Sequence, residues 1–203
     1  MSLRILTPLL AIVFALGFVQ AAGAQRLSDG YNFLKAVRDS DGTKVTQFLN
    51  EPGQTIVNTR DSDTGETALH IVARRGDTTY LRFLMARGAN VNQQDRRGNS
   101  PLMIAVTSNF AEGVEVLTRY RANPNLANSS GETPLIRAVQ LRNFEIARAL
   151  LAAGADPDQV DSLAGQSARD YARIDGRSPA LARLLADAPR VEARRAVAGP
   201  TLP

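Results

Sequence analysis

Two short landmarks recur along this chain at a nearly constant interval. The first begins at a glycine, and successive copies lie 33, 33 and 34 residues apart, at Gly65, Gly98, Gly131 and Gly165. The second is a turn-forming segment rich in Gly, Ala, Asn and Asp, with copies at residues 87–92, 121–125 and 153–158. Two landmarks in fixed phase at a period of 20–50 residues are typical of an array of stacked structural units. The repeat therefore constrains the fold more than any other feature.

The start of each unit predicts a helix. A hydroxyl residue precedes an apolar run in every copy, where its side chain can accept a hydrogen bond from a free helix N–H group. Pro101 and Pro134 come next, at the first helical position, where a missing N–H costs nothing. Apolar residues such as Leu69, Val72 and Ala73 then recur at helical spacing. The four hydroxyl residues are Thr67, Ser100, Thr133 and Ser167.

A second helix follows within the same unit. After a short break at residues 75–77, a further apolar stripe covers residues 80–84. This stripe stops near Gly88, a residue suited to the left-handed conformation that follows a helix. Each unit is thus predicted to be a helix, a tight turn, a second helix and a turn-rich loop.

These residues resemble the ankyrin repeat, whose hallmark is T-P-L-H-x-A. The hallmark is matched at residues 67–72, 100–105 and 133–138. The resemblance implies an all-α solenoid of about five stacked helix-turn-helix repeats with divergent terminal caps. It covers residues 28–187, within a domain placed at 25–187. The approximate repeats are 28–60, 62–94, 95–127, 128–161 and 162–187.

Two departures from the pattern affect the expected turns. The turn glycine at Gly76 is replaced by Asn109 and Arg142 in the next units. Asn tolerates a left-handed conformation, but Arg is expected to be strained there, which predicts a turn rebuilt around Asn143. In the last unit the hallmark Thr-Pro-Leu becomes Ser-Ala-Arg at residues 167–169.

The terminal repeats need a polar outer surface because nothing stacks on them. In the first repeat the outward residues are predicted to be Asn32, Lys35, Arg38, Lys44 and Gln47. The long connection at residues 50–54 is expected to project. In the last repeat, Tyr171, Ala172 and Ile174 are predicted to form an apolar face. Its outward cap would consist of Arg169, Arg173, Arg177 and Arg183.

Residues 1–24 have the pattern of a secretory signal peptide. Arg4 precedes an uncharged apolar run at 5–19, and small residues lead to an expected cleavage after Ala24. A retained membrane anchor is the alternative, but the run is shorter than the ~20 residues of a spanning helix. We therefore expect a periplasmic or secreted protein. Residues 188–203 are expected to be a disordered tail, with a basic membrane-contacting helix at 191–197 as the alternative.

The sequence offers little material for catalysis or metal binding. There is no cysteine, and His70 is the only histidine. A hydrolase would need to pair His70 with Ser62 or Thr67, whereas the family resemblance implies that its ring bonds the repeat turns. The acidic turn near Gly42 does not have EF-hand spacing, and no cluster suits another metal. We expect no enzyme activity, cofactor or metal.

The resemblance also implies where partners bind, namely the projecting turn tips and the exposed face of the first helix of each repeat. The predicted binding residues are Asp63, Glu66, Arg74, Arg75, Arg96, Arg97, Asn99, Thr107, Ser108, Gln140 and Leu141. The predicted structural residues are Gly65, Thr67, His70, Gly98, Pro101, Gly131, Thr133 and Pro134. The arginines at 74, 75, 96 and 97 are expected to cluster as a basic end of the groove, suited to carboxylates or an acidic protein.

Three functions remain open at this point. A non-catalytic protein–protein interaction module, binding another protein and acting as a monomer, fits the long surface of stacked repeats. A polyanion or nucleic-acid binder is the alternative, prompted by a sequence pI of about 9.9 and by the arginines. Stacking aromatics for that role are scarce, and export would separate the protein from the chromosome. An enzyme on this scaffold is the third and least supported reading.

Overall fold

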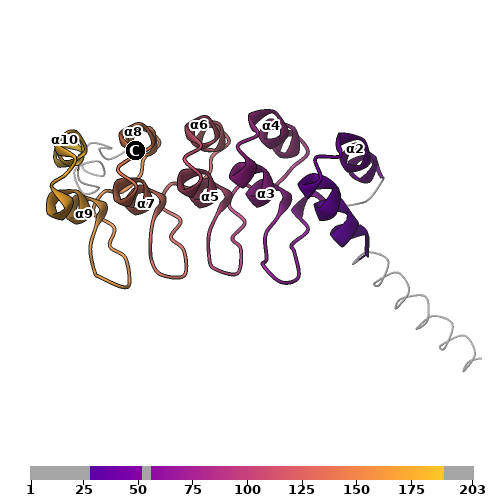
Figure 1. Cartoon of the computed structure of the whole chain (residues 1–203), viewed down its shortest axis with the longest axis horizontal. Helices are drawn as coiled ribbons and strands as arrows, with labels where there is room; N and C mark the ends of the chain where they lie inside the picture. Colours follow the sequence, from indigo (N-terminus) through magenta and orange to yellow (C-terminus); the bar gives the residue numbers. More distant parts are fainter. Residues whose placement is uncertain (1–27, 52–55, 190–203) are drawn as a thin grey trace, which may run out of the picture.

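The fold is a row of helix pairs. A computed structural model describes residues 28–51 and 56–189, and within them five helix pairs stand side by side (Figure 1). No strand occurs in these residues, only one isolated bridge between Val160 and Ser167. The predicted all-α repeat stack is confirmed. The predicted signal peptide, the part of the connection at 52–54 that is expected to project and the expected tail from residue 190 lie outside the described residues.

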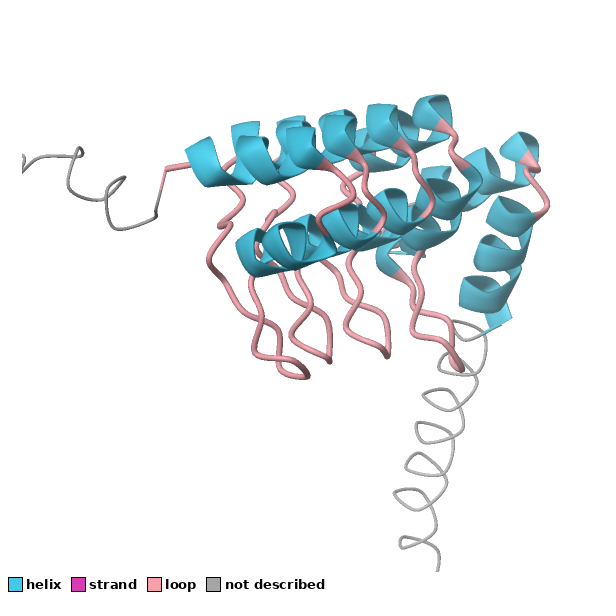
Figure 2. Cartoon of the chain, turned by 60° about the vertical axis from the view of Figure 1, so that its left-hand side comes forward, coloured by secondary structure: helices cyan, strands magenta, loops and turns pink. Residues whose placement is uncertain are grey.

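The helices form two rows (Figure 2). The first pair is a helix over residues 28–38 followed by α2 (Gly42–Asn50), with a short 3-10 turn, η1 (Ile56–Asn58), after it. The later inner helices are α3 (Ala68–Arg75), α5 (Pro101–Thr107), α7 (Pro134–Gln140) and α9 (Ala168–Asp175). Their outer partners are α4 (Thr78–Ala86), α6 (Ala111–Arg119), α8 (Phe144–Ala152) and α10 (Pro179–Asp187).

The predicted helix starts are found at the hydroxyl residues. Ser100 Oγ accepts a hydrogen bond from the N–H of Met103 at 3.2 Å, and Thr133 Oγ1 accepts one from Ile136 at the same distance. Pro101 and Pro134 occupy the first turn of α5 and α7. These side chains satisfy N–H groups that have no partner inside the helix, which sets where each inner helix begins.

The core is one continuous layer between the two rows. Leu69, Leu102 and Leu135 occupy the same hallmark position in successive repeats and are almost fully buried. Burying each leucine stabilises the fold by about 1.5–3 kcal/mol. Because each layer packs on its neighbours, the inner row forms a firm base for the loops that project from it.

The turn at Arg142 corrects one prediction. Arg142 adopts the left-handed conformation itself, with φ 54°, as Asn109 does with φ 56°. The turn is not rebuilt, and Asn143 instead caps α8 by accepting a hydrogen bond from the N–H of Ile146. The N–H of Arg142 bonds to Val139 O, and its guanidinium pairs with Asp175 at 3.0 Å. These contacts offset the roughly 1–2 kcal/mol cost of the left-handed conformation.

The terminal repeats follow the prediction only in part. All five polar residues predicted to face outward in the first repeat are exposed. In the last repeat, Ile174 is 60% exposed and does not join the apolar face. Arg169 does not turn outward either, because its guanidinium donates to the carbonyls of Leu185, Ala186 and Ala188 at the end of α10. Arg169 thus closes the last helix pair.

Four loops project from the inner row on the same side (Figure 1). We call them fingers, and their tips are residues 61–66, 95–99, 128–132 and 161–166. Each tip begins with Asp or Asn, whose side-chain oxygen accepts hydrogen bonds from backbone N–H groups further along the loop. The tips therefore share one shape although most of their side chains differ.

Backbone hydrogen bonds join each finger to the next. Arg96 N donates to Thr64 O at 2.9 Å, Ser129 N to Arg97 O at 3.0 Å, and Ser162 N to Ser130 O at 3.0 Å. Gly98 is needed at this contact: its φ is +77°, and a Cβ there would lie 2.5 Å from Ser129 N. The fingers consequently stand at a fixed spacing.

Candidate protein-binding groove

A hollow of about 540 Å³ lies between the fingers and the inner helices of the second to fourth repeats. Most of its lining was predicted from the sequence. Eight of the predicted binding residues line it, namely Asp63, Glu66, Arg74, Arg96, Arg97, Asn99, Thr107 and Ser108. Thr64, Asp95, Ile104 and Arg137 complete the lining. We call this hollow the central groove.

Asp95, Ile104 and Arg137 were not among the predicted residues, although the repeat offered a signal for two of them. Ile104 and Arg137 both occupy the x position of the hallmark, in the third and fourth repeats. Since a residue at this position lines the groove in two neighbouring repeats, aligning the repeats on the hallmark would have identified both. Asp95 opens its finger, and its role becomes visible only in the folded loop.

Two arginines of the groove are paired with carboxylates. Arg74 Nη1 donates to Glu66 at 3.1 Å, with a second, shorter contact from its other terminal nitrogen. This hydrogen bond raises the pKa of Arg74 above its ordinary value. Arg137 Nη2 lies 2.7 Å from Glu132. Glu66 and Glu132 therefore neutralise part of the positive charge, and the groove is less basic than the arginines alone suggest.

Other donors in the groove lack such partners. Arg96 contacts only the carbonyl oxygen of Ser62 through its side chain. Within the described residues, the exposed guanidinium of Arg97 makes no hydrogen bond or ion pair, and the buried Nε of Arg137 has no acceptor. Asp95 belongs to the same finger as Arg96 and Arg97, and its oxygens accept hydrogen bonds from Arg97 N, Asn99 N and the Asn99 amide. The groove thus has free cationic donors and few free acceptors.

Three predicted binding residues lie outside the central groove. Arg75 points to the first repeat, where it donates to Val37 O at 2.8 Å and to Ser40 Oγ at 2.6 Å and stacks over the Tyr80 ring. It does not join the other three arginines as predicted, because the first repeat offers it acceptors. Gln140 and Leu141 are exposed at the end of α7, and Leu141 is 47% exposed.

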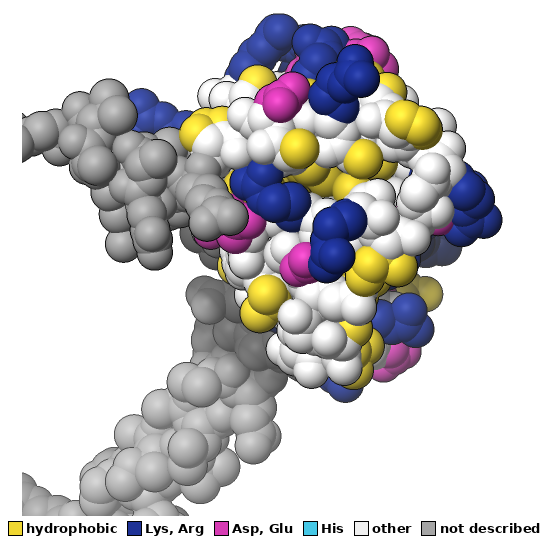
Figure 3. Space-filling model, turned by 90° about the vertical axis from the view of Figure 1, so that its left-hand side faces the viewer, with side chains coloured by type: hydrophobic (Ala, Val, Ile, Leu, Met, Phe, Trp, Pro, Cys, Tyr) yellow, Lys and Arg dark blue, Asp and Glu magenta, His cyan; other side chains and the backbone are white. Residues whose placement is uncertain are grey.

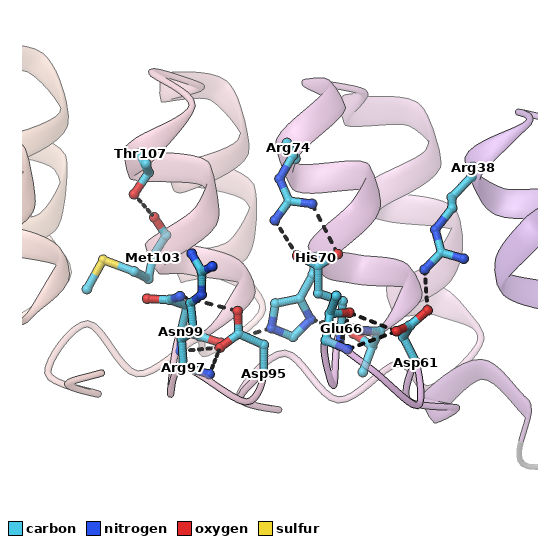
Figure 4. A network of polar contacts seen from close by, with 12 residues as sticks. Arg38, Asp61, Glu66, His70, Arg74, Asp95, Arg97, Asn99, Met103 and Thr107 are labelled. Atoms are coloured by element: carbon cyan, nitrogen blue, oxygen red, sulfur yellow. Dashed lines mark hydrogen bonds and ion pairs between the residues drawn. The ribbon is translucent and has the colours of Figure 1, made fainter. Parts of the chain in front are cut away.

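His70 is enclosed beneath the groove (Figure 4). Its Nδ1 accepts a hydrogen bond from Thr67 N at 3.1 Å and lies 2.9 Å from Thr67 Oγ1. Because Nδ1 is an acceptor, the neutral ring carries its proton on Nε2, which donates to Asn99 O at 2.9 Å in the next repeat. Burial lowers the pKa of His70, although nearby Asp95 and Glu66 oppose the shift.

The surroundings of His70 do not suit catalysis. Both ring nitrogens are engaged, so neither is free to accept a proton from a nucleophile. Ser62, the serine considered for a hydrolase, donates to Asp63 instead. Across the described residues, no group of three His, Asp or Glu side chains is placed to hold a metal ion. None of the helices described is long and apolar enough to cross a membrane.

The character of this side of the stack changes toward the C-terminal end. Ile174 occupies in the fifth repeat the place that Arg74 and Thr107 hold in the groove. At the tip of the last finger, Leu163 is 83% exposed. Hydrophobic side chains share the C-terminal end of the molecule with charged ones (Figure 3). The last repeat therefore adds two exposed large apolar side chains, Leu163 and Ile174, at positions that are polar or charged in the middle repeats.

Comparison with known proteins agrees with the repeat. A model of three ankyrin-repeat copies matches residues 33–128, and the model of a single ankyrin repeat matches residues 130–162. Within the described part of the chain, these matches cover the first four helix pairs almost completely. The fifth pair, at residues 162–187, lies beyond them, where the hallmark residues differ most.

Similar curated proteins include three neurogenic locus notch homolog proteins. Neurogenic locus notch homolog protein 4 of Homo sapiens is 40% identical over 94 residues, which are 46% of this chain and 5% of that protein. Protein 1 of Xenopus laevis is 34% identical over 149 residues, 72% of this chain and 6% of the relative. Protein 1 of Danio rerio is 36% identical over 140 residues, 68% of this chain and 6% of the relative. The chain thus spans only 5–6% of the length of these relatives.

Proposed function

Because this chain belongs to the ankyrin-repeat family, we propose that it is a non-catalytic module that binds another protein through its central groove. One observation carries the proposal: the groove has arginine donors that no carboxylate of the described residues neutralises, on a backbone of fixed spacing. The Arg97 guanidinium has no partner within the described residues, and Arg96 donates only to a backbone carbonyl oxygen. A rigid surface with free donors binds without first ordering its loops, which lowers the entropic cost of association.

Export to the periplasm or the cell exterior is part of the same proposal. It is supported by the sequence of residues 1–24, in which an apolar run is followed by small residues ending at Ala24. Expressing the full chain in a Gram-negative host, separating the periplasm and measuring the N-terminal residue by mass spectrometry tests it. We expect a protein that begins at Gln25; an unprocessed protein in the cytoplasm or membrane contradicts it.

The polyanion alternative receives less support from the groove. Glu66 and Glu132 each pair with an arginine there, so the positive charge forms no continuous stripe. Binding of a labelled oligonucleotide over a salt series separates the two functions, because binding to phosphates weakens steeply with salt. We expect no binding of the oligonucleotide at physiological ionic strength, whereas binding that strengthens steeply as salt is lowered would favour the polyanion function.

Site-specific photocrosslinking tests protein binding. A photoreactive residue replaces Thr107 in the groove and, in a second protein, Arg82 on the outer helix α4. Both positions are exposed, so the two probes differ mainly in the surface that they report. Each protein is incubated with fractions of the source cells, and crosslinked proteins are identified by mass spectrometry.

We expect at least one protein to crosslink from position 107 and not from position 82. An excess of unmodified chain should suppress this crosslink by competition. Crosslinks that arise equally from both positions, or none from position 107, contradict binding through the groove.

A further inference from the structure

The two halves of the finger side differ in chemistry, and this difference indicates what kind of partner fits. Resting on the proposed function, we propose that the occupant is an extended segment of a partner protein with acidic residues at the central groove and a large apolar residue at the fifth repeat. The acidic residues would bind Arg97 and Arg137, and the apolar residue would pack against Ile174 and Leu163.

The acidic residues of the proposed segment are inferred from the groove arginines, which keep donors that no carboxylate of the described residues binds. Arg97 has an exposed guanidinium without a partner in the described residues, and Arg137 bonds Glu132 there through Nη2 alone. Two nearby carboxylates are already occupied, Glu132 by Arg137 and Asn128, and Asp95 by backbone N–H groups of its own finger. An incoming carboxylate would therefore gain charge-assisted hydrogen bonds without displacing an existing pair.

Asp63 is the one acidic side chain of the lining that remains largely open, since it accepts only from Ser62 Oγ. It belongs to the second repeat, at the N-terminal edge of the groove. An acidic segment centred between the third and fourth repeats would keep clear of this carboxylate. The charge distribution therefore favours the side of the groove that faces the apolar end.

The apolar part follows from exposure at the end of the stack. Leu163 and Ile174 are 83% and 60% exposed, and Tyr171 beside them is half-buried. In the middle repeats the positions of Leu163 and Ile174 carry polar residues such as Ser130, Arg97 and Thr107. A large apolar side chain is stabilising only where it is removed from water. An apolar side chain of the partner would cover Leu163 and Ile174 in the complex.

The spacing of the repeats sets the length of the segment. Packed helices lie about 8–10 Å apart, so the third and fifth repeats are separated by roughly 20 Å. An extended chain advances about 3.3 Å per residue. The partner's acidic residue that binds Arg97 and its apolar residue should therefore lie about six residues apart.

A fluorescent peptide binding assay with the full chain tests this inference. The probe is a peptide of about twelve residues in a Gly-Ser background, with an Asp-Glu pair and a Leu-Phe pair about six residues apart. We expect saturable binding, measured by fluorescence anisotropy, that weakens as salt screens the charged contacts. Replacing the acidic pair by Asn-Gln, the apolar pair by Ser-Ser, or shortening the spacing to about two residues should each weaken binding about tenfold.

Variants of the protein assign the two contacts. Arg97→Glu should weaken the acidic peptide about tenfold and the Asn-Gln peptide little, whereas Arg82→Glu, an exposed arginine on outer helix α4, should change neither. Ile174→Ser with Leu163→Ser should remove the preference for Leu-Phe, and Tyr120→Ser at the end of α6 is the control. Circular dichroism checks folding, and Arg97→Gln is used if the Glu variant is unfolded.

Failure of this inference is distinguishable from failure of protein binding. Absence of peptide binding, or equal binding by Arg97→Glu and the unaltered chain, overturns the inference. If position 107 still crosslinks a protein in that case, the proposed function stands and the partner has another chemistry. If a crosslinked partner contains an acidic and an apolar residue at the expected spacing, and a peptide of that segment competes with the probe, the inference is supported.

Discussion

The second and fifth repeats start their inner helices with the same local device but use it differently. In the second repeat, the side chain of His70 accepts a hydrogen bond from Thr67 N. In the fifth, Asp170 accepts one from Ser167 N at 3.2 Å. His70 is fully buried and also donates to the next repeat, whereas Asp170 is half-buried and pairs with Arg173.

The difference shows that position in the stack decides which residues suit a helix start. An interior repeat is covered on both sides, so a neutral ring that bonds across the boundary is stabilising, while a charged group would lose its hydration. The fifth repeat has no neighbour after α10 in the described residues, and charged residues there remain hydrated. Its Arg169, at the place of Leu69, bonds carbonyls of its own last helix instead of filling the core.

The largest effect is expected when a core leucine is removed from an interior repeat and, in a second variant, from the last repeat. Leu102→Ala in the third repeat should lower the free energy of unfolding by about 3–5 kcal/mol, since neighbours on both sides keep the cavity open. Leu181→Ala in α10 should mainly unfold the last repeat, because terminal repeats open independently of the rest. Urea unfolding followed by circular dichroism and hydrogen exchange compares the two. Equal global losses would contradict an interior–terminal difference.

The second-largest loss of unfolding free energy is expected when the side chains that bond the first N–H groups of the inner helices, His70 and Asp170, are removed. His70→Ala should cost about 3 kcal/mol, because Thr67 N loses its buried acceptor and Asn99 O loses one of its two donors, keeping only Asp95 N. Asp170→Ala should cost about 1 kcal/mol, the usual value of a helix cap. His70→Met, the residue found at Met103 in the third repeat, restores the packing without the hydrogen bonds and should lie between them. The urea midpoints of the three variants measure these losses. Equal destabilisation by His70→Ala and Asp170→Ala would contradict the difference between the second and fifth repeats.

Lowering the pH should reveal the same difference between buried His70 and half-buried Asp170 without any substitution. Because burial lowers the pKa of His70 in the folded protein below its ordinary 6.5, the unfolded chain binds a proton more readily. The contribution of neutral His70 is complete above pH 6.5 and decreases as the pH falls toward the folded pKa, by about 1.4 kcal/mol per pH unit. Unfolding free energies measured from pH 7 to 5 should show this slope in the unaltered chain and in Asp170→Ala, but not in His70→Met. A slope that persists in His70→Met would assign it to another group.

The smallest effect concerns the turn that ties the fourth repeat to the fifth. Arg142→Asn relieves a left-handed arginine but loses an exposed ion pair with Asp175, and exposed pairs contribute about 0–1 kcal/mol. We expect a net change below about 0.5 kcal/mol in the urea midpoint, as Asn109 already occupies the matching turn. A loss above about 2 kcal/mol would mean that this contact holds the last repeat in place.

The parts of the fold set by local chemistry could be predicted from the sequence. Ser100 and Thr133 cap helices that begin at a proline, and no distant contact is needed to place them. The parts set by contacts between repeats could not. Arg75 turned to the first repeat because Val37 O and Ser40 lie within its reach, and Arg169 turned to the end of α10. A long flexible side chain selects its partner only after the neighbouring elements have been placed.

The same limit applies to the central groove. The positions of the finger tips follow from the repeat, so most of the lining of the groove was found. Which arginines stay free depends on where Glu66 and Glu132 lie in the folded fingers, and the sequence does not contain this information in a local form.

A main-chain hydrogen bond joins each finger to the next, and the side chains of Arg96 and Asn128 add further bonds between neighbouring fingers. Tip side chains that take no part in these bonds, such as Arg97 and Leu163, can therefore be exchanged while the main-chain bonds between tips remain, provided that Gly98 and Gly131 are kept. New binding preferences are consequently accessible by single substitutions that leave the architecture intact, which makes this chain a suitable starting point for selecting binders to unrelated targets.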